Sequence, residues 1–190
     1  MPLIASLRNR ALCQLASKAA MGDRTAFGKL YQKLLPEVFA FVRRRINKVA
    51  DAEDVTSQVF AKMIEQLSTF DSNRGTIRAW VFTMVRNLIV DHYRSQGRRM
   101  TMSIEGELVD RPEDASQDAR WKLQSLLKEI SPEGQELLLM HYGDGLRFGE
   151  IAEILGISKD AAKQRCSRLV RQLRKDLDPS SSKQEPRYAS

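Results

Sequence analysis

The segment 148–175 constrains the fold of this chain more than any other stretch. It begins with a helical pattern whose apolar face is formed by Phe148, Ile151, Ala152 and Leu155. Gly156 interrupts that pattern, and Ser158 then offers a hydroxyl oxygen that can cap a second helix. A short helix, a glycine-containing turn and a second helix together predict a helix-turn-helix.

The second helix of this motif is predicted to be amphipathic and basic. Its apolar side is formed by Ala162, Cys166, Leu169, Val170, Leu173 and Leu177. Between Lys159 and Lys175 it carries seven lysine or arginine residues and one acid. Such a helix fits the major groove of DNA, whereas the alternative is a helical hairpin with a solvated basic face. The turn, the cap and the charge agree in favouring DNA binding.

Charge is distributed unevenly along the 190 residues, whose net charge is +7. Residues 23–99 carry 14 basic and 8 acidic groups, and residues 119–178 carry 11 and 9. Between them, residues 100–118 carry 1 basic and 6 acidic groups. Two basic blocks separated by an acidic segment favour a polyanionic partner such as nucleic acid.

Several classes of protein are disfavoured by what the sequence contains. Cys13 and Cys166 lie far apart without metal-ligand neighbours, so neither a disulfide framework nor a metal site is expected. His92 and His141 lack catalytic or metal-ligand spacing, and no glycine-rich phosphate loop occurs, so we expect no enzyme and no cofactor. Without an apolar run of the ~20 residues that cross a bilayer, and without a signal peptide, we expect a cytoplasmic protein with no direct membrane insertion.

Helical periodicity dominates the remaining sequence, and strand patterns are nearly absent. Residues 27–46 follow a helical period that Pro36 should kink or split. Asp51 is the expected cap of the next helix, residues 71–75 form a polar loop, and a third helix is expected over about 77–95. Ser131 and Pro132 begin another helix, which continues to Gly143.

These patterns predict an all-α protein with two small helical domains joined by a flexible acidic linker. The expected units are an N-terminal extension at 1–22, a first domain at 23–99, the linker at 100–118, a helix-turn-helix domain at 119–178 and a disordered tail at 179–190. Residues 1–21 are expected to extend the first helix of the first domain.

Two blocks in series, residues 22–99 and 131–177, resemble the extracytoplasmic-function sigma factors of the sigma-70 family. The stretches DAEDVTSQVFAKMIEQLSTFD and IRAWVFTMVRNLIVDHYRSQGRR are similar to region 2 of that family. The stretch SPEGQELLLMHYGDGLRFGEIAEILGISKDAAKQRCSRLVRQLRKDL is similar to region 4. The resemblance implies a subunit that binds core RNA polymerase and directs promoter-specific initiation, without chemistry of its own.

The resemblance also implies a polymerase-docking surface on the second helix of the first domain. That surface would contact the clamp helices of the largest polymerase subunit, and its matching residues are Ala52, Asp54, Val55 and Gln58. On spacing alone, acids at this position could instead serve the dipole of a helix N-terminus.

A minus-ten reader is implied by the loop 71–76 and the helix that follows it. Melting DNA costs pairing and stacking energy, which capture of an extruded base can offset. The residues assigned to this site are Ser72, Asn73, Arg74, Arg78, Arg86, Asn87 and Arg94. Trp80 lies on the apolar stripe of the helix, which favours a place in the core over base stacking.

The helix-turn-helix is implied to read duplex minus-thirty-five DNA. The residues assigned to it are Lys159, Ala161, Lys163, Gln164, Arg165 and Arg168, with Lys163 better placed for a phosphate. The resemblance also places this domain on the flap of the second-largest polymerase subunit. An anti-sigma factor is a further expected partner, and the basic surfaces are expected to be masked until polymerase separates the domains.

The sequence departs from the family pattern at two places, and one competing function stays open. Gly149 and the Asp160-Ala161-Ala162 run depart from the residues common in the family, which affects base preference more than architecture. The competing function is a helix-turn-helix regulator that acts without being a polymerase subunit, with residues 23–95 as a sensor or dimerisation module.

Overall fold

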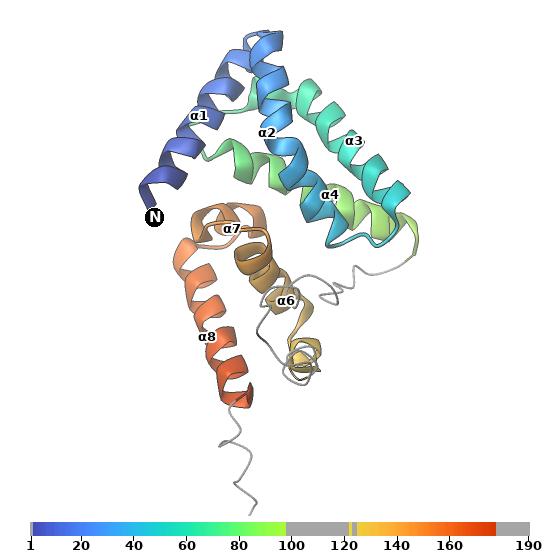
Figure 1. Cartoon of the computed structure of the whole chain (residues 1–190), viewed down its shortest axis with the longest axis vertical. Coiled ribbons are helices and arrows are strands. Elements are labelled where there is room, and N and C mark those ends of the chain that lie inside the picture. Colours follow the sequence, from blue (N-terminus) through green and yellow to red (C-terminus); the bar gives the residue numbers. More distant parts are fainter. Residues whose placement is uncertain (1, 98–121, 123–124, 178–190) are drawn as a thin grey trace, which may run out of the picture.

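The computed structural model describes residues 2–97, 122 and 125–177, and every regular element in those ranges is a helix (Figure 1). The prediction of an all-α fold with two helical units is therefore confirmed for the described part of the chain. The acidic segment 100–118 and the tail 179–190 lie outside the described residues, so their predictions stay open.

The first unit contains five elements: α1 (Pro2–Ala20), α2 (Arg24–Arg43), α3 (Val49–Gln66), the 3₁₀ turn η1 (Leu67–Thr69) and α4 (Ile77–Ser95). The bounds of α4 match the predicted helix, and the side chain of Thr76 caps it by accepting from the backbone N–H of Ala79 at 3.1 Å. Pro36 lies inside α2, which continues past it without a break.

Two predictions about helix ends in this unit were wrong. The cap of α3 is Lys48, and Asp51 lies within the first turn, where its carboxylate pairs with the Lys48 ammonium at 2.8 Å. Residues 2–20 do not extend α2 but form a separate helix, because the chain turns at Gly22, whose φ is +93°, and Asp23 then caps α2. The sequence pattern alone did not locate either helix boundary.

The second unit carries the predicted helix-turn-helix. Residues 125–129 are helical, followed by α6 (Pro132–Leu138), the π turn η2 (Leu139–Gly143), α7 (Phe148–Leu155) and α8 (Lys159–Leu177). Ser131 caps α6, which has proline in its first turn, as predicted. His141 holds η2 to α7, because its ring stacks on Phe148 at 4.2 Å and its Nδ1 donates to the Leu146 carbonyl at 3.0 Å.

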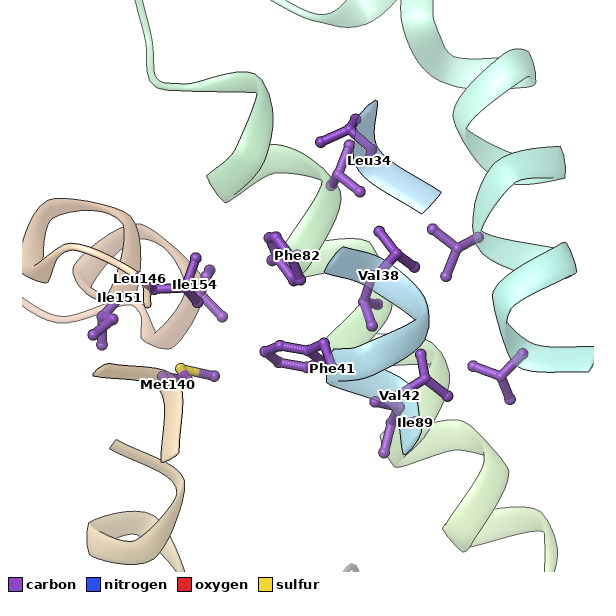
Figure 2. Close-up of a cluster of buried hydrophobic side chains, with 14 of the residues drawn as sticks. Leu34, Val38, Phe41, Val42, Phe82, Ile89, Met140, Leu146, Ile151 and Ile154 are labelled. Atoms are coloured by element: carbon purple, nitrogen blue, oxygen red, sulfur yellow. The ribbon is translucent and has the colours of Figure 1, made fainter. Parts of the chain in front are cut away.

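A shared apolar core joins the two units. Phe41 of α2 and Phe82 of α4 are fully buried and point toward the second unit, as Figure 2 shows. They face buried side chains of η2, α7 and the loop between them, namely Met140, Leu146, Ile151 and Ile154. Full burial of one such side chain is worth about 1.5–3 kcal/mol, so this contact holds the units together.

The packing between the units involves α7 and leaves α8 largely apart. Helix α7 lies against α4, whereas α8 runs away from the first unit over most of its length (Figure 1). The apolar stripe of α8 packs on its own unit, where Ala162, Cys166 and Leu173 are buried as predicted. This arrangement gives the two predicted DNA-binding surfaces different environments.

Candidate nucleic-acid interface

The turn between α7 and α8 fixes the orientation of the basic helix. Gly156 adopts the left-handed conformation, with φ at +65°, and the backbone N–H of Ile157 donates to the Ala152 carbonyl at 3.0 Å. The Ser158 hydroxyl accepts from the backbone N–H of Ala161 at 3.1 Å, which caps α8 as the sequence predicted.

The outer face of α8 presents the predicted minus-thirty-five residues to solvent. Lys159, Lys163, Gln164, Arg165 and Arg168 are exposed, and Ala161 is half-buried beside them. An open groove of about 510 Å³ runs along this face between Lys163, Gln164, Ser167 and Arg168. Three residues of the predicted set, Lys163, Gln164 and Arg168, therefore line one open groove, whereas Lys159 and Arg165 are exposed outside it.

The predicted minus-ten loop is a compact polar turn. The backbone N–H of Asn73 donates to the Asp71 carboxylate at 2.9 Å, and the N–H of Arg74 donates to the Asp71 carbonyl at 3.1 Å. Asp71 holds the turn through these two bonds, and the side chains of Ser72, Asn73 and Arg74 are exposed, as a base-contacting loop requires.

Two of the three arginines that follow this loop on α4 are paired with acids of the second unit. Arg78 contacts Glu37 of its own unit at 3.0 Å and Glu150 of α7 at 3.2 Å. Arg86 donates from Nε to Glu136 of α6 at 2.8 Å. These two cations of the predicted minus-ten site are therefore already bound to carboxylates.

A third ion pair closes the same interface at its far end. Arg44 and Arg45 both donate to Asp144, each at 2.8 Å, and the side chains of Arg45 and Asp144 are only 1% and 2% exposed. Burial lowers the pKa of Arg45, and its charge is supported by Asp144 and by the face of the Phe41 ring, 3.3 Å from the guanidinium carbon.

Helix α7 also covers the backbone at the loop. The carboxylate of Glu153 accepts from the backbone N–H of Thr76, and burial raises the pKa of that carboxyl. A Cβ atom on Gly75 would lie 2.3 Å from Glu153 Oε2, so the glycine makes room for this contact. Two carboxylates of α7, from Glu150 and Glu153, thus lie where the loop enters α4.

The remaining residues of the α4 set behave differently. Asn87 and Arg94 are exposed, so they are available to a ligand in this conformation. Trp80 packs against the core and against Phe70, with ring centroids 5.7 Å apart, which agrees with the predicted core role. Tyr93 is half-buried and its hydroxyl donates to the Arg45 carbonyl oxygen.

The predicted polymerase-docking residues divide between surface and core. Asp54 and Gln58 are exposed on α3, whereas Ala52 and Val55 are 0% and 3% exposed and belong to the core of the first unit. In this conformation, Ala52 and Val55 support the surface that Asp54 and Gln58 present.

Sequence reasoning missed the acids that close the interface. Glu136 and Glu150 are only 5% and 3% exposed, and each lies in a segment rich in apolar residues. A carboxylate within an apolar helical run signals a buried ion pair, since a buried charge needs a partner. That signal could have identified both residues, but not which arginines they contact.

The described residues show neither a metal-type cluster nor a candidate membrane span. Within residues 2–97, 122 and 125–177, no three histidine, cysteine or carboxylate side chains lie close enough to hold a metal ion. No helix in those ranges is long and apolar enough to cross a bilayer. Cys13 and Cys166 are free thiols, and burial raises the pKa of Cys166.

The two units match two models of one protein family. Residues 30–99 match Sigma-70 region 2, and residues 120–173 match Sigma-70 region 4. Together they cover both predicted DNA-binding surfaces and the helix α3. The helix α1 precedes both matches.

Similar proteins carry the same family name. The chain is 29% identical to the ECF RNA polymerase sigma factor BldN of Streptomyces coelicolor over 85% of its own length and 64% of that of BldN. It is 25% identical to the ECF RNA polymerase sigma factor SigK of Mycobacterium bovis over 87% of its own length and 93% of that of SigK. The structure of CnrH in complex with the cytosolic domain of CnrY matches with a TM-score of 0.62 and 27% identity, covering 86% of this chain and 95% of CnrH.

The fold and the site define a two-unit, non-catalytic DNA-binding subunit of the transcription machinery. The chain belongs to the extracytoplasmic-function sigma factors of the sigma-70 family. It therefore directs promoter-specific transcription initiation through regions 2 and 4, and it is not an enzyme.

Proposed function

We propose that the structure is the resting form of this sigma factor, in which region 4 blocks the minus-ten site of region 2. The observation that supports this proposal is the pairing of Arg78 and Arg86 with Glu150 and Glu136. Carboxylates and DNA phosphates compete for the same guanidinium groups, so the two arginines are withheld from DNA until the units separate.

In the open form, we assign minus-ten recognition to the loop and α4. Ser72, Asn73 and Arg74 surround an extruded base, and Arg78, Arg86, Asn87 and Arg94 hold the adjacent backbone or base edges. Capture of the extruded base in the polar loop offsets the cost of unpairing, because only a melted strand can place a base there. The cationic side chains beside the loop hold the phosphates of the same strand.

Minus-thirty-five recognition is assigned to the exposed face of α8. Lys159, Ala161, Gln164, Arg165 and Arg168 lie in the N-terminal half of α8, the part of a recognition helix that reaches base edges in the major groove. Lys163 is assigned to a phosphate, and its contribution should be sensitive to salt. This face is accessible in the resting form.

The partners proposed for this chain are core RNA polymerase, promoter DNA and an anti-sigma factor. Asp54 and Gln58 would contact the clamp helices of the largest polymerase subunit, supported from beneath by Ala52 and Val55. Region 4 would contact the flap of the second-largest subunit. The similar protein CnrH is held in a complex with the cytosolic domain of CnrY, which supports a protein inhibitor for this chain and a cytoplasmic location.

Run-off transcription tests the promoter-recognition role. The full chain is mixed with core polymerase and a promoter library, and defined start sites above those of core polymerase alone are expected. An absence of such start sites would overturn it. If the chain alone binds promoter duplex as specifically as it does with polymerase, and does not change transcription by polymerase, the helix-turn-helix regulator is favoured instead.

A further inference from the structure

Helix α1 forms one wall of a polar groove whose other wall is the predicted minus-ten loop. The groove measures about 1180 Å³ and runs between α1 and residues 72–76, with Arg147 and Glu153 of the second unit at one side. From α1 it is lined by Asn9, Arg10, Cys13, Gln14, Ser17 and Lys18. Neither family match includes α1, since the first begins at residue 30.

The charge of this groove suits a nucleic-acid strand. Its cations are Arg10, Lys18, Arg74 and Arg147, and its one acid is Glu153. Glu153 and Arg147 both belong to the second unit, so separation of the units would leave a groove whose charged side chains are all cationic. Arg10 and Lys18 are exposed and form no ion pair within the described residues.

The α1 wall is held rigidly enough to position these side chains. Leu12 and Ala16 are 1% and 0% exposed and belong to the core, so one face of α1 is fixed against the first unit. Arg10, Gln14 and Lys18 are spaced four residues apart and therefore share the opposite, exposed face. A row of polar side chains along about two helical turns matches the extended backbone of a single strand.

We propose that α1 is a second binding wall for the single-stranded promoter DNA that enters the minus-ten loop. Arg10 and Lys18 bind phosphates of the nucleotides next to the captured base, and Gln14 lies between them as a polar contact. The inference rests on the minus-ten role proposed above for residues 72–74, because the groove is continuous with that loop.

The test uses holoenzyme assembled from core polymerase and the full chain, on a promoter with 2-aminopurine in the minus-ten non-template strand. R10Q/K18Q removes two positive charges from the groove. K29Q/K33Q removes two from exposed positions of α2 outside the groove and serves as the matched control. We expect R10Q/K18Q to lower the open-complex equilibrium constant roughly tenfold, as two exposed charged groups allow. The salt dependence should weaken by about 0.7 in log–log slope for each phosphate that the variant no longer binds.

The outcomes separate this inference from the proposed function. If wild-type holoenzyme opens the promoter and R10Q/K18Q behaves like K29Q/K33Q, the α1 wall is refuted while minus-ten recognition stands. If R10Q/K18Q weakens assembly with core polymerase instead, the groove is a protein contact and the inference is equally refuted. If wild-type holoenzyme opens no promoter, the proposed function itself fails.

Discussion

The basic surfaces of α4 and α8 look alike in sequence but differ in the folded chain. Arg78 and Arg86 of α4 are 15% and 31% exposed in their side chains and are paired with acids of the other unit. Lys163, Arg165 and Arg168 of α8 lie on an open face. A basic stripe on a helix therefore indicates a possible DNA contact, but only tertiary packing decides whether that contact is available.

The difference has a consequence for regulation. In the proposed resting form the chain could sample duplex DNA through α8, but it could not hold a melted strand through Arg78 and Arg86 until the second unit moves away. Because the covering acids lie on the unit that carries α8, opening would free the minus-ten arginines and reposition the minus-thirty-five reader in one movement.

The largest effect is expected from removing the acid of the buried pair that closes the interface. D144N leaves Arg45, whose side chain is 1% exposed, without a charged partner, and should destabilise the closed arrangement by about 3 kcal/mol. Urea unfolding followed by fluorescence measures this change. D91N, at an exposed position of α4, should change stability by less than about 0.5 kcal/mol; equal effects of the two variants would mean that Asp144 does not hold the units together.

Charge reversal on the open surface should affect DNA binding without affecting assembly. R168E is expected to weaken the minus-thirty-five contribution by about 2 kcal/mol, roughly 30-fold, while polymerase binding is retained. Competition binding of holoenzyme to promoters with intact or scrambled minus-thirty-five elements measures it. R174E, near the other end of α8, is the control, and equal loss of promoter and polymerase binding in R168E would show that α8 has another role.

Removing the side-chain cap of α8 should have a smaller effect, in kcal/mol, than D144N or R168E. S158A removes the hydroxyl that accepts from the Ala161 N–H and should cost about 1 kcal/mol of stability. S167A, an exposed position within α8, should be neutral or slightly stabilising because alanine favours helix. Thermal unfolding of both variants checks this, and an unchanged melting temperature in S158A would argue against the cap.

The smallest effect is expected from replacing Gly149, the second residue of α7. A Cβ at Gly149 meets nothing within 4 Å, so G149A should stabilise α7 by about 0.5–1 kcal/mol. G156A should instead destabilise, because Gly156 has a φ of +65°. Chemical unfolding of the pair decides the matter; a loss of stability in G149A would mean that α7 requires the glycine.

Sequence periodicity predicted the elements whose folding is local. The apolar stripe of α8, its Ser158 cap and the bounds of α4 were all correct, because burial on one helical face leaves a regular signal. The cap of α3 at Lys48 was missed because an acid such as Asp51 is favoured in the first turn of a helix as well as at its cap. The separate helix α1 was missed because Gly22 is the only helix-breaking residue between α1 and α2.

The pairing across the units could not be predicted from one sequence. Glu136 and Arg86 are 50 residues apart, and Glu150 and Arg78 are 72 apart, so no helical period relates them. The sequence predicted that the basic surfaces would be masked. Within the described residues, Arg78 and Arg86 of α4 are covered, whereas Arg94 and the outer face of α8 are exposed. Burial of Ala52 and Val55 likewise appears only once α3 is packed.

Distance measurement between spin labels on the two units tests the central claim most directly. Labels at Lys29 of α2 and Gln172 of α8, both exposed, would be placed in a C13S/C166A background so that no native thiol is labelled. We expect one narrow distance distribution in the free chain and a distribution at longer distances after core polymerase is added. A free chain that already populates the longer distances, or a distribution that polymerase leaves unchanged, would contradict it.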